Sequence, residues 1–140
     1  MSALRGLVKE HTALMHLASD VSRLLAEVQE NPAPHVQEEL QAVLEVFRDS
    51  FWAHFEHEQK DLFPVARKVL GEPPSETDRL ELEQSSLLEL LDELCVTQTI
   101  SELVQVAQRF FQGFEAHLTD KADFLLKHKY FLFPEEQMAG

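Results

Sequence analysis

The sequence predicts a single all-α domain, an up-down-up-down antiparallel four-helix bundle that spans residues 1–140. Apolar residues recur at helical spacing along almost the whole chain, and no stretch shows the alternation that is typical of a strand. Helix breakers are few and clustered, because the chain contains only four glycines and six prolines. Short connections between long helices favour antiparallel neighbours, and this gives the bundle its expected topology.

Two proline-containing segments divide the chain, at residues 31–34 and 71–74, and a softer break lies at residues 96–99. We therefore expect helices near residues 3–30, 36–70, 76–95 and 100–128. Pro64 should kink the second helix or end it early, because proline lacks an N–H group and clashes with the preceding turn. Each expected helix carries one apolar stripe, as packing in a bundle requires.

The composition argues against a nucleic-acid-binding, a membrane-spanning and a disulfide-linked protein. Twelve basic side chains against 25 acidic ones give a formal charge of −13, which repels phosphate backbones, so we expect no nucleic acid as a direct partner. No apolar stretch approaches the roughly 20 residues that span a bilayer, and the first residues lack the apolar core of a secretory signal. A single cysteine, Cys95, leaves no intramolecular disulfide. We expect a cytoplasmic protein that does not associate with membranes.

Polar side chains interrupt the apolar stripes at positions where the core of the bundle is expected. They are His11, His54, Glu58, Gln84, His117 and Lys121. Burying such a group costs roughly 1–3 kcal/mol unless a partner is supplied, and burying a charge costs more. Several of them in one core therefore predict a shared site. The remaining histidines fit the stripes less well, and we expect them at the surface or at the end of the bundle. These are His16, His35, His57 and His128.

Helix geometry predicts that the polar side chains meet at one height. His11 precedes the first turn by roughly 20 residues and His54 follows it by a similar number, so at about 1.5 Å per residue both lie some 30 Å from that turn. The second and fourth helices run in the same direction, which places His54 level with His117 and Glu58 level with Lys121. The polar residues should therefore form one layer across the bundle.

The two halves of the chain resemble each other around this layer. The segment Glu10-His11-x-x-Leu14 is echoed by Glu83-Gln84-x-x-Leu87. In the same comparison, Lys121 stands opposite Glu58. The first half therefore has the composition of a metal-ligand set. In the second half, two of the three corresponding positions carry a different residue type, namely Gln84 in place of a histidine and Lys121 in place of a carboxylate.

These residues resemble the hemerythrin family, and in particular its HHE cation-binding domains. The match is Lys9-Glu10-His11 in the first expected helix and the run His54-Phe-Glu-His-Glu58-Gln-Lys-Asp-Leu62-Phe63-Pro64 in the second, and it extends over nearly the whole chain. The resemblance implies a four-helix bundle with a di-iron centre that is held by histidines and bridged by two carboxylates. It also implies roles in oxygen binding, in iron or oxygen sensing, and in redox or nitric-oxide chemistry.

Carried over onto this chain, the resemblance matches His11, His54 and Glu58 to ligands of the first iron, and His117 to a ligand of the second. Because only His117 remains for the second iron, the resemblance implies at most one non-heme metal ion. This ion would be held by His11, His54 and Glu58, with His117 as a further ligand if it reaches across. Iron is the metal that the family implies, and zinc or manganese would also suit this ligand set.

Three positions depart from the family pattern and alter the expected site. Leu80 and Gln84 stand where the family supplies two histidines, and Lys121 stands where a second bridging carboxylate is expected. An ammonium beside a carboxylate can take over the electrostatic role of a lost cation. The second interpretation is therefore a metal-free bundle in which Glu58 and Lys121 form a buried ion pair.

The two interpretations imply different functions. A single metal ion would serve the binding or sensing of a small diatomic ligand, whereas a metal-free bundle would act as a regulatory or protein-interaction module. An enzyme is a third option, but the sequence offers no identifiable acid, base or substrate pocket. The apolar C-terminal segment, residues 130–134, is expected to fold over the open end of the bundle or to form the contact of a homodimer.

Overall fold

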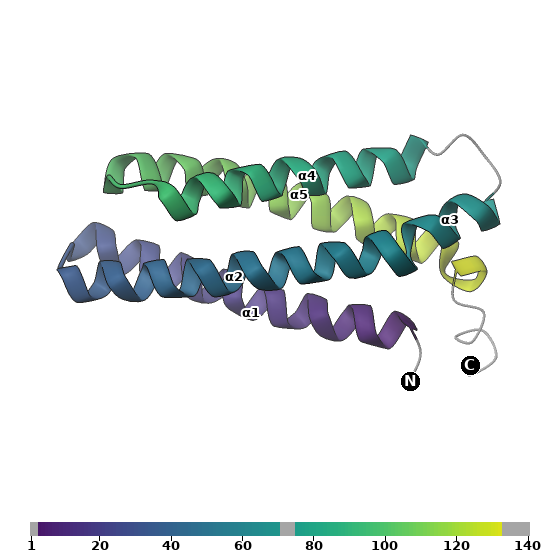
Figure 1. Ribbon diagram of the computed structural model, residues 1–140, viewed down its shortest axis with the longest axis horizontal. Helices are drawn as coiled ribbons and strands as arrows, with labels where there is room; N and C mark the ends of the chain where they lie inside the picture. The colour runs from purple at the N-terminus through teal and green to yellow at the C-terminus, as the bar shows by residue number, and fades with distance from the viewer. Residues whose placement is uncertain (1–2, 71–74, 133–140) are drawn as a thin grey trace.

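The structure, a computed structural model, describes residues 3–70 and 75–132. Five α-helices account for nearly all of these residues (Figure 1). They are α1 Ala3–Glu30, α2 Pro34–Asp61, α3 Phe63–Leu70, α4 Ser75–Val96 and α5 Ile100–Leu132. The described residues contain no strand, which confirms the all-α class. The four long helices build the bundle, and α3 is a short continuation of α2.

The helices are arranged as two antiparallel pairs. Figure 1 shows α1 beside α2 and α4 beside α5, with the α1–α2 turn and the α4–α5 connection at the same end of the molecule. Helix α1 packs mainly against α2, α4 packs mainly against α5, and α2 also packs against α4. The start of α1 and all of α3 lie at the opposite end. The predicted up-down-up-down bundle is therefore confirmed.

The second expected helix, over residues 36–70, is divided into two at the position that Pro64 indicated. Helix α2 ends at Asp61, and α3 begins at Phe63 with Pro64 in its first turn. Proline is tolerated there, because the first N–H groups of a helix have no partner within the helix. The N–H of Leu62 still donates to the carbonyl oxygen of Glu58 at 3.0 Å, so the chain bends without losing this backbone hydrogen bond.

Two apolar cores fill the bundle, and the polar residues that interrupt the apolar stripes lie between them. The larger core is built around Phe47, Phe51, Phe110 and Phe114, whose ring centroids lie 5.5 to 6.4 Å apart. The smaller core consists of Leu7, Leu62, Phe63, Ala66, Leu80 and Phe124. Along α2, His54 and Glu58 occupy the buried positions between the two cores. A polar layer thus separates two regions that are otherwise apolar.

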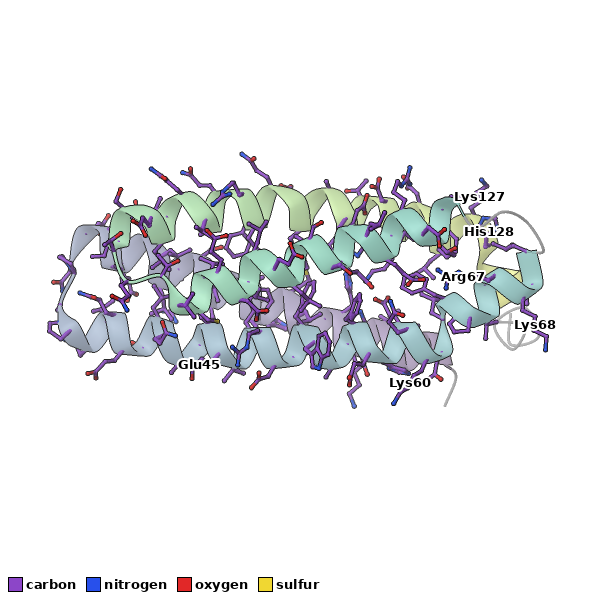
Figure 2. The ribbon with its side chains drawn as sticks, turned by 45° about the horizontal axis from the view of Figure 1, so that its top comes forward. Glu45, Lys60, Arg67, Lys68, Lys127 and His128 are labelled. Carbon is purple, nitrogen blue, oxygen red and sulfur yellow. The ribbon has the colours of Figure 1, made fainter. Side chains whose placement is uncertain are left out.

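Charged side chains join the helices at the end of the bundle that contains α3. Figure 2 shows Arg67, Lys127 and His128 at this end. Arg67 donates to Asp78 at 2.8 Å, and Lys127 donates to Glu76 at 3.4 Å. Both carboxylates belong to the first turn of α4, where negative charge also interacts favourably with the helix dipole. These contacts tie α3 and α5 to the start of α4.

Two expectations concern the surroundings of the bundle. The apolar segment at residues 130–134 has its side chains outside the described part of the chain, so its expected roles stay predictions. No helix among the described residues is long and apolar enough to cross a membrane.

Truncating the centre of the larger core should strongly destabilise the fold. Phe110 is fully buried and contacts the rings of three other core phenylalanines, so Phe110→Ala should lower the free energy of unfolding by about 3–5 kcal/mol. Leu82→Ala, on a side chain that is 69% exposed, is the control and should change it by less than about 0.5 kcal/mol. Urea unfolding followed by circular dichroism measures both, and equal effects would contradict the assigned core.

Candidate functional site

The polar layer is built by one or two residues from each long helix. Helix α1 supplies His11, α2 supplies His54 and Glu58, α4 supplies Gln84, and α5 supplies His117 and Lys121. All of them except the half-buried His11 are buried. The ring centroids of His11 and His54 lie 6.2 Å apart, which confirms that the first two helices bring these imidazoles together. The predicted convergence of the six side chains is therefore observed.

A buried ion pair lies at the centre of the layer. The ammonium of Lys121 lies 3.1 Å from each carboxylate oxygen of Glu58, and the two side chains are 7% and 1% exposed. The side-chain amide of Gln84 donates to Oε1 of Glu58. Three groups from α2, α4 and α5 are thus joined through one carboxylate. The height that the sequence predicted for Glu58, Lys121 and Gln84 is confirmed.

His54 connects this pair to the first helix. Its Nδ1 lies 2.7 Å from Oε1 of Glu10, and its Nε2 lies 3.5 Å from the ammonium of Lys121. Burial lowers the pKa of His54, so the neutral imidazole is favoured. In that form Nδ1–H donates to the Glu10 carboxylate, and the lone pair on Nε2 faces the ammonium. His54 therefore behaves as an oriented acceptor for a positive charge.

His117 has the corresponding arrangement in the other half of the bundle. Its Nδ1 lies 2.8 Å from Oε1 of Glu83, and the residue is 1% exposed. Burial, followed by the nearby charge of Lys121, lowers the pKa of His117 to about 3. When the neutral imidazole donates through Nδ1–H to the Glu83 carboxylate, the lone pair of Nε2 lies inside the bundle. That atom is buried and has no hydrogen-bond partner within the described part of the chain.

His11 is the third imidazole of the layer. Burial and the charge of Lys121 lower its pKa to about 4, so it is also neutral near pH 7. Its Nε2 is buried and, among the described residues, lacks a hydrogen-bond partner. The layer thus contains one positive charge, one negative charge and three neutral imidazoles.

Two carboxylates beside the polar layer, those of Glu10 and Glu83, orient its histidines. The sequence reasoning did not assign them this role. Glu10 accepts from Nδ1 of both His54 and His57, at 2.7 and 2.8 Å. Burial raises the pKa of Glu10, but the hydrogen bonds from these two imidazoles outweigh that effect and lower it. For Glu83, burial and a hydrogen bond with Asp120 raise the pKa to about 7. The internal echo of Glu10-His11 in Glu83-Gln84 was the signal that could have identified both.

The histidines that were expected outside the layer are indeed outside it, although not all are free surface residues. His16 and His35 are exposed. His57 is only 29% exposed, because Nδ1 binds Glu10 and Nε2 lies 2.9 Å from Asp61. His128 lies at the end of the bundle, with its ring centroid 5.1 Å from that of Phe124.

The donor set does not fit a di-iron centre. Leu80 is fully buried in the smaller apolar core, and Gln84 uses its amide to bind Glu58, so α4 offers no imidazole to the layer. The ammonium of Lys121 holds the position between Glu58 and His54 that a cation shared by these ligands would need. Across residues 3–70 and 75–132, no group of three or more His, Cys, Asp or Glu side chains is arranged to hold a metal ion. Metal binding by His11, His54, Glu58 and His117 therefore stays a prediction.

Comparison with known protein families gives a match over most of the chain. The family described as hemerythrin HHE cation binding domain matches residues 2–128, which is most of the chain. No curated protein and no solved structure gave a match.

Acid should destabilise the protein through the buried imidazoles. In the unfolded chain a histidine binds its proton near pH 6.5, whereas His11 and His117 in the folded protein bind theirs only near pH 4 and pH 3. Their contribution to stability is therefore fully present above pH 6.5 and is lost as the pH falls toward 4 and 3. Glu83 acts in the opposite direction, because its raised pKa favours the folded state below about pH 4.5 and this contribution is lost as the pH rises through 7.

Urea unfolding between pH 4 and pH 7 tests this assignment. His117→Gln should reduce the loss of stability on acidification relative to the wild type, since one buried imidazole no longer titrates. The control is His35→Gln, at an exposed position, and it should leave the pH dependence unchanged. If both variants keep the wild-type pH dependence, His117 is not a neutral buried imidazole.

Proposed function

Because the chain belongs to the hemerythrin HHE cation-binding domain family, we propose that it is a member whose cation is supplied by its own Lys121. In this proposal the domain binds no metal ion and acts as a regulatory or protein-interaction module. The observation that carries it is the ammonium of Lys121, 3.1 Å from both oxygens of the buried Glu58. Its location and partners are proposed with it: a cytoplasmic domain that works with another protein or with a second copy of itself.

The electrostatics of the layer support an internal cation. A carboxylate that is 1% exposed requires a compensating positive charge, because an unpaired buried charge costs several kcal/mol. Lys121 meets both oxygens of Glu58 and also faces Nε2 of His54, which are the contacts that a cation shared by these two residues would make. The lysine is covalently attached, so the layer remains neutral whether or not metal is present in the surroundings.

Gln84 supports the same conclusion from the third long helix. A metal-binding imidazole at this position would need its nitrogen lone pair directed at the ion. The amide of Gln84 instead donates to Oε1 of Glu58, and thus adds a second hydrogen-bond donor to the carboxylate that Lys121 neutralises. Glu58 is therefore satisfied by donors from two helices.

A single bound metal ion is the second candidate, and one observation favours it. Nε2 of His11 and Nε2 of His117 are buried without a partner in the described part of the chain, and such atoms are potential ligands. With His54 and Glu58 they could hold one ion for the binding of a small diatomic ligand, if Lys121 moved aside. This alternative requires the ammonium to leave its carboxylate.

Metal analysis separates the two candidates. Protein that is loaded with Fe(II) without oxygen, desalted and measured by mass spectrometry should contain far less than one iron per chain. On exposure to air it should develop no near-ultraviolet ligand-to-metal absorption. One iron per chain that is lost in His54→Ala would overturn the metal-free proposal and establish the second candidate.

Restoring the family's ligand set should restore metal binding. The triple variant Leu80→His, Gln84→His, Lys121→Glu replaces the three departures from the family pattern and supplies two imidazoles and a carboxylate. We expect its iron content after the same loading to rise well above that of the wild type. An iron content no higher than that of the wild type, in a variant that is folded by circular dichroism, would show that these positions do not face one site.

Removing the ammonium should strongly destabilise the protein. Lys121→Met leaves the Glu58 carboxylate buried and unpaired, so we expect the free energy of unfolding to fall by about 3–5 kcal/mol. The double variant Glu58→Gln, Lys121→Met removes both charges and should recover a large part of this loss. As a control, Arg23→Met breaks an exposed ion pair with Glu27 and should cost less than about 1 kcal/mol. A well-tolerated Lys121→Met would indicate that Glu58 is neutralised by something other than the lysine.

A further inference from the structure

A pocket reaches the polar layer from the surface between α1 and α5. Its volume is about 110 Å³. The walls are apolar and include Leu7, Val8, Leu118 and Leu125, whereas His11, His54, Glu58 and Lys121 line its inner part. Val8 is 54% exposed and Ala122, which also lines the pocket, is exposed, so the pocket is accessible from outside.

A second, much smaller cavity lies inside the layer. Its volume is about 10 Å³, which is close to the space that one water-sized group needs. His11, Gln84 and His117 line it, and each of them contributes a buried polar atom without a hydrogen-bond partner in the described part of the chain: Nε2 of the two imidazoles and Oε1 of the amide. The cavity shares His11, His54, Leu118 and Lys121 with the outer pocket, so the two spaces are adjacent.

These three atoms require a hydrogen-bonding partner of a particular kind. In the tautomer in which Nδ1–H donates to Glu83, Nε2 of His117 is an acceptor. Oε1 of Gln84 is an acceptor, because the amide nitrogen donates to Glu58. Nε2 of His11 can donate or accept, depending on the tautomer. A hydroxyl group, which donates once and accepts as well, can satisfy one acceptor and pair with His11 at the same time.

The charge of the site excludes ionic ligands. The ammonium of Lys121 lies 3.1 Å from both oxygens of Glu58, so the two charges neutralise each other and this pair leaves no net charge for an ionic ligand to meet. An anion or a cation brought into this layer would remain uncompensated, and burying an unpaired charge is strongly unfavourable. The ligand that matches the site is therefore uncharged.

We propose that the outer pocket and the inner cavity together bind a small neutral alcohol, with its hydroxyl group among His11, Gln84 and His117 and its short apolar chain against Leu118 and Leu125. An engineered apolar cavity of about 150 Å³ binds benzene, so a pocket of about 110 Å³ has room for a chain of about four carbon atoms. The proposal rests on the proposed function, since it takes the layer to be neutral and free of metal. If the domain is a regulatory module, small neutral alcohols are the class of ligand that it would sense.

The test uses n-butanol as the probe and the metal-free full chain as the receptor. We expect saturable shifts of the imidazole resonances of His11 and His117 in nuclear magnetic resonance spectra, with a dissociation constant on the order of 1 mM for so small a ligand. Butyrate and butylammonium have chains of similar length but carry a charge, and they should bind at least roughly tenfold more weakly. Equal binding of the charged probes, or the absence of saturable shifts with n-butanol, would overturn the proposal.

Two pairs of variants locate the site. Ala122→Leu fills the outer pocket and should weaken n-butanol binding at least roughly tenfold, whereas Ala116→Leu, at an exposed position of the same helix, should not. His11→Leu removes one polar partner of the hydroxyl group and should weaken binding, whereas His16→Leu, on the exposed side of α1, should not. Wild-type affinity in both Ala122→Leu and His11→Leu would place any alcohol site elsewhere and overturn this one.

The n-butanol test and the metal test have separate readouts, so their failures can be told apart. Stoichiometric iron with retained n-butanol binding would overturn the proposed function and leave the pocket assignment standing. Metal-free protein without saturable n-butanol binding would leave the proposed function intact and overturn the pocket assignment.

Discussion

The carboxylate of Glu58 is the constraint on which the centre of this bundle depends. It is 1% exposed and lies between two apolar cores, so the surrounding helices have to supply both its compensating charge and its hydrogen bonds. Lys121 from α5 and Gln84 from α4 meet this requirement directly. His54, one turn before Glu58 on α2, places its Nε2 beside the same ammonium. The packing of three helices at this height thus follows from one buried negative charge.

In both halves of the bundle a glutamate orients a buried histidine, but the group that the histidine faces differs. Glu10 holds Nδ1 of His54, and Glu83 holds Nδ1 of His117, so each imidazole presents Nε2 to the interior. Such carboxylate–histidine pairs prepare an imidazole to face a positive charge. In the first half that charge is the ammonium of Lys121, whereas Nε2 of His117 faces the small cavity. The Glu10–His54 pair therefore directs Nε2 of His54 at the ion pair, whereas the Glu83–His117 pair leaves Nε2 of His117 without a hydrogen-bond partner in the described part of the chain.

The sequence was sufficient to predict the bundle and the composition of its polar layer, but not the hydrogen-bond network. Residues on the apolar seam, such as Glu58 and Lys121, stand out because a charge interrupts a hydrophobic stripe, and helix geometry then fixes their relative heights. Glu10 and Glu83 lie beside the seam, where an acidic residue resembles an ordinary surface charge in a chain of net charge −13. Which imidazole nitrogen stays unpaired depends on side-chain rotamers and tautomers, and these are set only in the folded structure.

Stability alone does not explain why a polar layer interrupts the core, because a buried ion pair is often no more stabilising than apolar residues of similar volume. The geometry of the ion pair does, however, favour one position of α5 along the bundle over the others. If α5 slid by one turn along α2, apolar side chains could still pack on apolar side chains, but Lys121 and Glu58 would each be buried without the other. We infer that the ion pair fixes the register of α5 against α2, and that the pocket between α1 and α5 is held at the height of the polar layer as a result.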